Sequence, residues 1–261
     1  MLDKESITLS LSSSVLAHIA LLETLTIIDS TNAYLLRQDM NEKISVCLAE
    51  CQTAGRGRRG RTWVSPFAKN IYLSLKITVE SGLGALEGLS LAVGVAAARA
   101  LNNLGVKDIQ LKWPNDVLWC GRKLGGVLID VVGDPAGRCQ VVVGIGLNLH
   151  ADKTMMSSID QSWVSLADIV VKAPSRNLAV AELLNEVVEL LANYEQSGFA
   201  GYRAPWELLN AHANQLVNIH VGSALVVGRV KGVNSSGALV LATDNGEQVF
   251  HGGEVSLRVV E

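Results

Sequence analysis

The sequence concentrates arginine and glycine in one short segment. Gly55–Arg61 reads GRGRRGR, with four arginines and three glycines in seven residues. Glycine lets backbone N–H groups come close to an anion, and guanidinium groups match pairs of phosphate oxygens. We interpret the segment as a phosphate-binding loop, because predicted ordered elements flank it at Val46–Glu50 and Thr62–Val64. A solvated basic loop, or an arginine–glycine segment that contacts RNA, is the alternative interpretation.

A second segment combines oxygen ligands with a lysine. Residues 112–116 read KWPND, and Lys123 follows seven residues after Asp116, within GRKLGG. Asp116 and Asn115 offer oxygen atoms of the kind that Mg²⁺ prefers. Lys123 offers a positive charge, and the glycine pair after it leaves the backbone open to a ligand. An ordinary hairpin with Pro-Asn-Asp in its turn would show the same pattern. Beside the arginine–glycine segment, it indicates a nucleotide site built from two segments.

Two further motifs are weaker by themselves. Asp29-Ser-Thr-Asn32 is typical of a helix N-terminus, and its hydroxyls could also bind a polar ring. GIGLN at residues 144–148 lacks the third glycine of a dinucleotide fingerprint and follows a predicted hairpin strand. No Ser–His–Asp or Cys–His arrangement stands out. The available chemistry is therefore phosphate binding and activation rather than covalent catalysis by a side chain.

The composition restricts the class of protein. The 261 residues are 49% hydrophobic and 18% charged, with a net charge of −3. These values exclude a disordered chain, a coiled coil and a global basic field for nucleic acid. Four cysteines and five histidines show neither a disulfide framework nor zinc-ligand spacing. The apolar runs at 7–22 and 89–98 are too interrupted or too short for a signal peptide or a membrane span. We expect a cytoplasmic protein with no membrane segment.

The elements predicted around these motifs are helices and mostly antiparallel strands. Helices are expected from the Asp29–Asn32 cap onward and over 86–104 and 180–191. Strands are expected over 45–50, 70–79, 109–113, 117–120, 124–132 and 140–149. The segment up to Ile28 is short and mildly apolar, and its apolar run at 7–22 is interpreted as a core element. The predicted fold class is α+β, with a mixed, largely antiparallel sheet flanked by helices.

The sequence pattern changes in the last part of the chain. Short strands are expected over 217–221, 224–233, 238–243, 248–251 and 255–260, divided by Gly, Asn and Ser. Such closely spaced strands are typical of a small β-barrel. A segment this short is marginally stable alone, so we expect it to pack on the main domain. The predicted domains are 1–212 and 213–261.

Taken together, the motifs resemble those of the biotin protein ligases. The matching segments are DSTN at 29–32, QTAGRGRRGRTW at 52–63, KWPND at 112–116, RKLGG at 122–126, GIGLN at 144–148 and GGEVSL at 252–257. The resemblance runs from about residue 25 to the end. It implies a catalytic domain like that of the class II aminoacyl-tRNA synthetases and an SH3-like C-terminal barrel. It also implies an ATP-dependent enzyme that makes biotinyl-5′-AMP, releases pyrophosphate and transfers biotin to a lysine of a carrier protein.

The resemblance implies roles for individual residues. Catalytic roles fall to Lys123, Arg56, Arg58 and Asp116. Biotin contacts fall to Ser30, Thr31, Asn32, Gln52, Arg56, Gly57, Arg58, Lys123, Gly125 and Gly126. ATP or adenylate contacts fall to Arg58, Arg59, Arg61, Trp63, Asn115, Asn148 and Trp163. Asp116 and Asn115 would serve Mg²⁺. These groups fit the chemistry, because negative charge gathers on the transferring phosphorus and on the leaving pyrophosphate.

Two other functions remain open at this point. An RNA-binding protein would use the arginine loop, yet aromatics are only 5% of the chain and Trp63 alone lies beside the loop. A lipoyl or octanoyl ligase shares the fold and the acyl-adenylate chemistry, but the complete biotin-type loop disfavours it.

The resemblance also implies partners. The expected acceptor is the biotin carboxyl carrier protein of acetyl-CoA carboxylase or a similar carrier domain. Many bacterial members carry an N-terminal winged helix-turn-helix, but only 28 residues precede Asp29. We therefore expect no specific DNA binding. Exposed hairpin strands around Val127–Val132 could pair across a homodimer.

Overall fold

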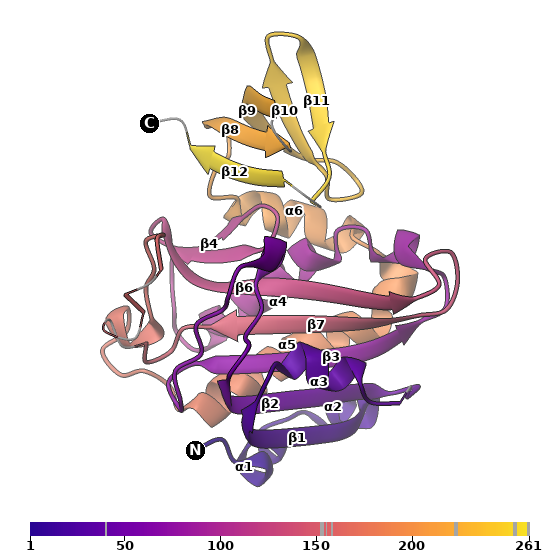
Figure 1. The fold of residues 1–261 in the computed structure, drawn as a ribbon, viewed down its shortest axis with the longest axis vertical. Helices are drawn as coiled ribbons and strands as arrows, with labels where there is room; N and C mark the ends of the chain where they lie inside the picture. Colours follow the sequence, from indigo (N-terminus) through magenta and orange to yellow (C-terminus); the bar gives the residue numbers. More distant parts are fainter. Residues whose placement is uncertain are drawn as a thin grey trace.

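Two β-sheets organise the chain. The structure is a computed structural model, and it describes residues 1–39, 41–151, 154, 156–157, 159–221, 224–252 and 255–259. The larger sheet has seven strands in the order β1-β2-β3-β7-β6-β5-β4, and the smaller has five in the order β11-β10-β9-β8-β12. Figure 1 shows the smaller sheet above one edge of the larger one, with a helix at the junction.

The larger sheet is antiparallel except for the pairing of β1 with β2. This confirms the mixed, largely antiparallel sheet. Its strands are β1 (Ile19–Ile28), β2 (Ile44–Gln52), β3 (Ile71–Val79), β4 (Ile109–Lys112), β5 (Asp116–Trp119), β6 (Arg122–Gly133) and β7 (Cys139–Leu147). The central strands β2, β3 and β7 are buried along most of their length. Such nearly continuous apolar runs are expected where both faces of a sheet are covered.

Helices cover the two faces unequally. The helices are α1 (Lys4–Leu9), α2 (Ser13–His18), α3 (Thr31–Leu36), α4 (Leu89–Asn103), α5 (Arg176–Ser197) and α6 (Ala200–Leu209). Figure 1 shows the long helices α4 and α5 behind the sheet and the short α3 in front of it. Most of the front face is therefore left to loops, which is where a ligand site can form.

One helical segment, Leu83–Asn103, is long and apolar enough to cross a membrane by length and composition alone. Within it, α4 packs against α5 and against β4, β5 and β6. Its apolar side chains are buried against these elements, among them Leu89, Val93 and Leu101. Burial of this kind is what a core helix of a folded domain shows, as the sequence predicts.

The N-terminal segment is more ordered than expected. Helices α1 and α2 pack against α5, and β1 extends the sheet at its edge. The burial of Ile7, Leu11, Val15 and Leu22 confirms the core element predicted over 7–22, but its division into two short helices and the start of a strand was not predicted. Serines interrupt the apolar spacing of α1 and α2, but Asp3 and Ser12 cap them by accepting from Ser6 N and Val15 N. Helix α6 was not expected either.

The C-terminal strands are β8 (Leu216–Val221), β9 (Ala224–Val233), β10 (Leu239–Thr243), β11 (Gly246–Phe250) and β12 (Val255–Val259). All their pairings are antiparallel. The expected strands are thus confirmed, but β11 and β12 form the two edges and do not pair with each other within the described residues. Closure into a barrel is therefore not observed.

Close contacts fix the small sheet on the main domain. Trp113 Nε1 donates to the carbonyl of Gly237 at 3.1 Å, and Val233 N donates to Glu207 Oε1 at 2.6 Å. Gly237 has a φ of +76°, and a Cβ there would lie 2.8 Å from the Cα of Gly88. The junction therefore requires glycine at this position. It also holds the small sheet close to KWPND.

Candidate active site

A cavity of about 1260 Å³ opens on the front of the large sheet. Its walls come from α3, the arginine–glycine loop, the KWPND turn, β6, β7, the segment around Trp163 and strand β12. Most of the predicted site residues line it: Thr31, Asn32, Gln52, Arg56, Gly57, Arg58, Arg59, Arg61, Trp63, Asn115, Asp116, Lys123, Gly126, Asn148 and Trp163. The structure thus brings together motifs that are far apart in the sequence.

Two predicted residues do not line the cavity. Ser30 is 2% exposed and caps α3, accepting from Ala33 N at 3.4 Å. Gly125 lies in β6 opposite Leu147 of β7, where a Cβ would come 2.7 Å from the carbonyl oxygen of Gly146. Both residues therefore support the residues that line the cavity and do not face the cavity themselves.

The arginine–glycine loop folds back on itself. Gly57 N donates to the Arg61 carbonyl at 2.7 Å, and Trp63 N donates to the Gly55 carbonyl at 2.9 Å. Arg59 has a φ of 57°, the left-handed conformation. The turn is therefore compact, with its two ends held together by backbone hydrogen bonds.

Arg58 joins three parts of the chain. Its Nη1 donates to Asn115 Oδ1 at 3.2 Å, and its Nη2 donates to the Gly252 carbonyl, which precedes the last strand. Burial is the main influence on this guanidinium and lowers its pKa, although the group remains a cation. The arginine loop, the KWPND turn and the C-terminal sheet thus meet at one side chain.

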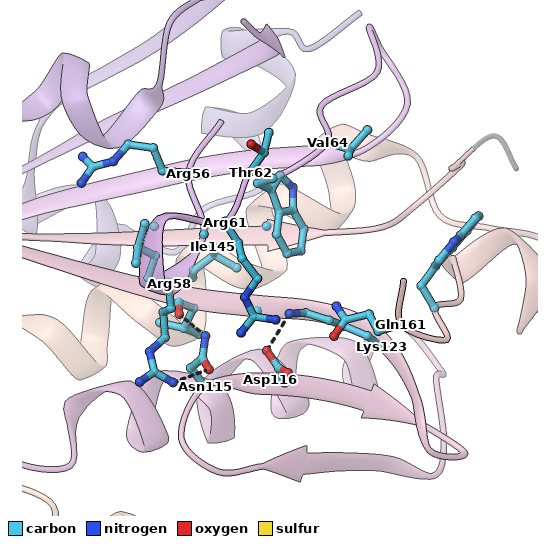
Figure 2. A pocket seen from close by; sticks show the side chains of 18 of the residues that line it. Arg56, Arg58, Arg61, Thr62, Val64, Asn115, Asp116, Lys123, Ile145 and Gln161 are labelled. Atoms are coloured by element: carbon cyan, nitrogen blue, oxygen red, sulfur yellow. Dashed lines mark hydrogen bonds and ion pairs between the residues drawn. The ribbon is translucent and has the colours of Figure 1, made fainter. Parts of the chain in front are cut away.

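Lys123 lies at the centre of the cavity. Its Nζ is 2.7 Å from Asp116 Oδ1 and 5.5 Å from the centre of the Trp63 ring. Figure 2 shows Arg61 pointing toward this ion pair from the other side. The backbone of Lys123 is held by the segment around Trp163: Lys123 N donates to the Ser162 carbonyl, and Val164 N donates to the Lys123 carbonyl, both at 2.9 Å. The ammonium is therefore positioned where several cationic groups converge.

Asn148 has a supporting place in the same wall. It is 2% exposed, and its Nδ2 donates to the carbonyls of Val164 at 3.2 Å and Lys123 at 3.4 Å. It thus ties the segment around Trp163 to the strand of Lys123.

The predicted metal ligands are already engaged. Asn115 Oδ1 accepts from Arg58, its Nδ2 donates to the Val127 carbonyl at 2.8 Å, and Asp116 pairs with Lys123. In the part of the chain that the structure describes, no three His, Cys, Asp or Glu side chains gather to hold a metal ion. The donors fit a magnesium ion that takes most of its ligands from phosphates and water and only one carboxylate, Asp116, from the protein.

The cavity includes cationic residues that the sequence analysis did not select. Lys112 and Arg258 line it, the second from the C-terminal sheet. Burial lowers the pKa of Lys112, and the neighbouring positive charges of Lys123, Arg258 and Arg61 lower it further against the effect of Asp116. Lys112 belongs to the KWPND motif, so its sequence neighbours could have indicated it. Arg258 carries no such local signal.

A polar floor lies under the other end of the cavity. Thr31 N donates to Gln52 Oε1 at 2.9 Å, and Gln52 Nε2 donates to Ser65 Oγ at 3.2 Å. Ser74 Oγ lies 2.7 Å from Thr31 Oγ1 and donates to Asn32 Oδ1 at 2.6 Å. Ser74 is fully buried in β3 and was not predicted, because its position in an alternating strand looks structural. The floor can bind a small polar ring.

Trp63 closes the space between the two ends. Gly146 of β7 makes room for its ring, since a Cβ at Gly146 would lie 2.5 Å from Trp63 Cε2. The indole Nε1 is buried and has no hydrogen-bond partner within the described structure. An apolar wall with one donor is suited to a flat ligand of mixed polarity.

Comparison with known proteins agrees with this geometry. Residues 24–148 match the Biotin/lipoate A/B protein ligase family, and residues 212–258 match the Biotin protein ligase C terminal domain. The bifunctional ligase/repressor BirA of Escherichia coli is 39% identical over 91% of this chain and 74% of its own length. The biotin–[acetyl-CoA-carboxylase] ligase of Paracoccus denitrificans is 33% identical over 87% of this chain and 96% of its own.

A solved structure extends the comparison to three dimensions. The biotin protein ligase from Aquifex aeolicus, in complex with biotin and ATP, superposes with a TM-score of 0.78. It is 25% identical, and the match covers 92% of this chain and all of that one.

Proposed function

Because this chain belongs to the biotin protein ligase family, we propose that its cavity joins biotin and ATP to biotinyl-5′-AMP and then biotinylates a carrier protein. The observation that carries the proposal is the convergence of Lys123, Arg58 and Arg61 beside a separate polar floor. One end of the cavity offers cations for phosphates, and the other offers hydrogen bonds for a ring.

The first step needs two anions to approach each other. A biotin carboxylate oxygen attacks the α-phosphorus of ATP, forming the mixed anhydride, and the bond to the pyrophosphate oxygen breaks. We assign to Lys123 the contact with both the carboxylate and the α-phosphate, and to Arg58 and Arg61 the stabilisation of charge on the phosphates. Magnesium, held by phosphate oxygens with Asp116, would supply further charge neutralisation on the phosphates.

The second step needs no nucleophilic side chain. The amine of a carrier lysine attacks the biotinyl carbonyl, the C–O bond to the phosphate breaks, and AMP leaves with the electron pair. AMP is a good leaving group, so the enzyme must chiefly shield the anhydride from water and admit the lysine. The arginine–glycine loop, which lines the cavity, is suited to the shielding when it closes over the substrates.

We propose the biotin carboxyl carrier protein of acetyl-CoA carboxylase as the acceptor, since the Paracoccus relative is named for that substrate. The division into a catalytic domain over 1–212 and a C-terminal domain over 213–261 is proposed with it. A cytoplasmic location and the absence of specific DNA binding stay predictions.

We also propose that two copies pair along β6. Strand β5 pairs only with the beginning of β6, from Arg122 to Gly126, whereas β7 follows the strand to Gly133. Val131 and Val132, at the far end of β6, are 37% and 56% exposed. A strand with a free edge and exposed apolar side chains is suited to pairing with another strand.

The proposal is tested by the identity of the acyl group. The protein is incubated with Mg²⁺, ATP, a carrier domain and either biotin or lipoate, and the carrier is analysed by mass spectrometry. We expect one biotinyl group on one lysine and no lipoyl group. Modification by lipoate but not by biotin would replace the proposal with the lipoyl-ligase alternative.

A further inference from the structure

A carboxylate that the proposed reaction does not use connects the arginine–glycine loop to the polar floor. Asp130 lies on β6, and within the described residues each of its oxygens has a partner. Oδ2 accepts from Asn32 Nδ2 at 2.9 Å, and Oδ1 accepts from Arg56 Nη2 at 3.2 Å. The side chain of Asp130 is 17% exposed. We propose that Asp130 is a positioning residue, which orients the Asn32 amide in the proposed biotin pocket and holds Arg56 beside it.

The first part of the argument is the orientation of Asn32. An ionised carboxylate only accepts hydrogen bonds, so it fixes the NH₂ of Asn32 on the side of Asp130. The carbonyl oxygen of Asn32 then faces Ser74, which must donate its single proton to it. Thr31 Oγ1 lies 2.7 Å from Ser74 Oγ, and the Thr31 hydroxyl donates its own proton to Gln52 Oε1 at 3.1 Å. Asp130 therefore sets the order of donors and acceptors from Asn32 to Ser74.

Sterics leave Asn32 few other arrangements. Its side chain is 4% exposed and lies on the backbone of β7, where a Cβ on Gly144 would come 2.3 Å from Asn32 Oδ1. The amide can flip in this space but cannot leave it. Its partners alone therefore decide which atom faces Ser74.

The second part of the argument is the loop. Figure 2 shows Arg56 pointing away from Arg58 and Arg61, which reach toward Asn115 and Lys123. Asp130 thus holds Arg56 away from the end of the cavity where Arg58, Arg61 and Lys123 would bind phosphates. The Arg56 side chain is 48% exposed, so the pair is weak enough to break and re-form as the loop moves.

Three variants separate the two contacts. Asp130→Ala removes both. Asp130→Asn keeps an oxygen that can accept from Asn32, but its NH₂ cannot accept from Arg56. Asp134→Asn removes the same charge from the turn after β6, where the side chain needs only to accept from Ala136 N, and serves as the matched control.

The KM for biotin measures the orientation of Asn32, and this part rests on the proposed function. Without Asp130, the Asn32 amide keeps only the long contact of Nδ2 with the Leu128 carbonyl at 3.5 Å among the described residues. The loss of the shorter bond from a buried amide weakens the pocket by about tenfold. We expect the KM for biotin of Asp130→Ala to be about tenfold above that of Asp130→Asn, with kcat for adenylate formation within about threefold. Equal KM values for these two variants would overturn the role in orienting Asn32.

Limited trypsin digestion of the ligand-free protein measures the contact with Arg56 and needs no activity. We expect cleavage after Arg56 to be about two- to fivefold faster in both Asp130 variants than in wild type and in Asp134→Asn. Unchanged cleavage would overturn the role in holding Arg56. If wild-type protein neither binds nor uses biotin, the proposed function fails, and the digestion alone decides whether Asp130 positions the loop.

Discussion

The Lys123 ammonium and the Asp116 carboxylate lie 2.7 Å apart, although their backbones are not opposite each other in the sheet. Asp116 faces Gly126 across β5 and β6, and Lys123 faces Leu118 after a register shift that leaves Leu124 of β6 without an opposite residue. The shift brings the two side chains together over the cavity. The lysine is thus paired within the protein and can exchange this partner for substrate anions when they bind.

Replacing Lys123 by Ala removes the charge that allows a carboxylate to approach a phosphate. The loss of one preorganised charge of this kind lowers the rate by about 10²–10³. We expect biotinyl-adenylate formation to fall by this factor while the protein stays folded by circular dichroism. Lys107→Ala is the control, since Lys107 is exposed and contacts only Asn102 among the interactions described. Near-normal adenylate synthesis by Lys123→Ala would remove this residue from the mechanism.

Gly146 can be tested as the position that makes room for Trp63. A Cβ there would lie 2.5 Å from the ring, so Gly146→Ala must push the indole into the cavity. Overpacking of this size costs about 1–3 kcal/mol. If the site bears this cost, the kcat/KM for biotin falls by roughly 5- to 150-fold. Gly201→Ala is the matched control, because a Cβ at Gly201 meets nothing within 4 Å. An unaffected Gly146→Ala enzyme would show that the ring does not border the substrate.

The loop from Gly55 to Arg61 should close only over substrates. Ordering seven residues costs about 7–14 kcal/mol, and each hydrogen bond to a charged group returns about 1.5–3 kcal/mol. Without substrates, Arg56 holds the loop through its contact with Asp130, and Arg58 holds it through contacts with Asn115 and Gly252. We expect trypsin to cut at the loop arginines rapidly in the free protein and much more slowly with biotin and ATP. Equal resistance in both states would mean that the loop is preformed.

His212 gives the protein a pH-dependent stability. Burial lowers the pKa of this buried imidazole to about 4, and the positive charge of Lys112 acts in the same direction. Between about pH 4 and 6.5 the unfolded chain binds a proton that the folded protein does not, so stability rises with pH across this window. We expect the free energy of unfolding to increase from pH 5 to pH 7 by about 2 kcal/mol more in wild type than in His212→Phe. If denaturant titrations give the same change in the free energy of unfolding with pH for both proteins, this account of His212 is contradicted.

Local sequence patterns predicted the elements around the site and missed those that depend on distant contacts. The alternation in 70–79 corresponds to β3, and the spacing from Val180 to Leu191 lies inside α5. By contrast, β1 forms an edge of the sheet and pairs in parallel with β2, which no short pattern specifies. Barrel closure also depends on pairing between distant strands, and the spacing of short strands could not decide it.

The same distinction holds within the site. The arginines, Asn115, Asp116 and Lys123 belong to dense local motifs, so their types and spacing identified them. Asp130 and Ser74 are single polar residues in apolar strands, and only the packing of β3 and β6 around Asn32 gives them partners. Ser30 and Gly125 were selected with their motifs, but they support the wall of the cavity instead of lining it.

Biotin-dependent release of pyrophosphate tests the central claim most directly. The protein is mixed with Mg²⁺ and ATP, and pyrophosphate is followed with and without biotin, with lipoate as the comparison acid. The account predicts release only when biotin is present, and a burst near one equivalent per enzyme when no carrier is added. Pyrophosphate release that is independent of biotin, or no release with it, would contradict the assignment of this cavity to biotin activation.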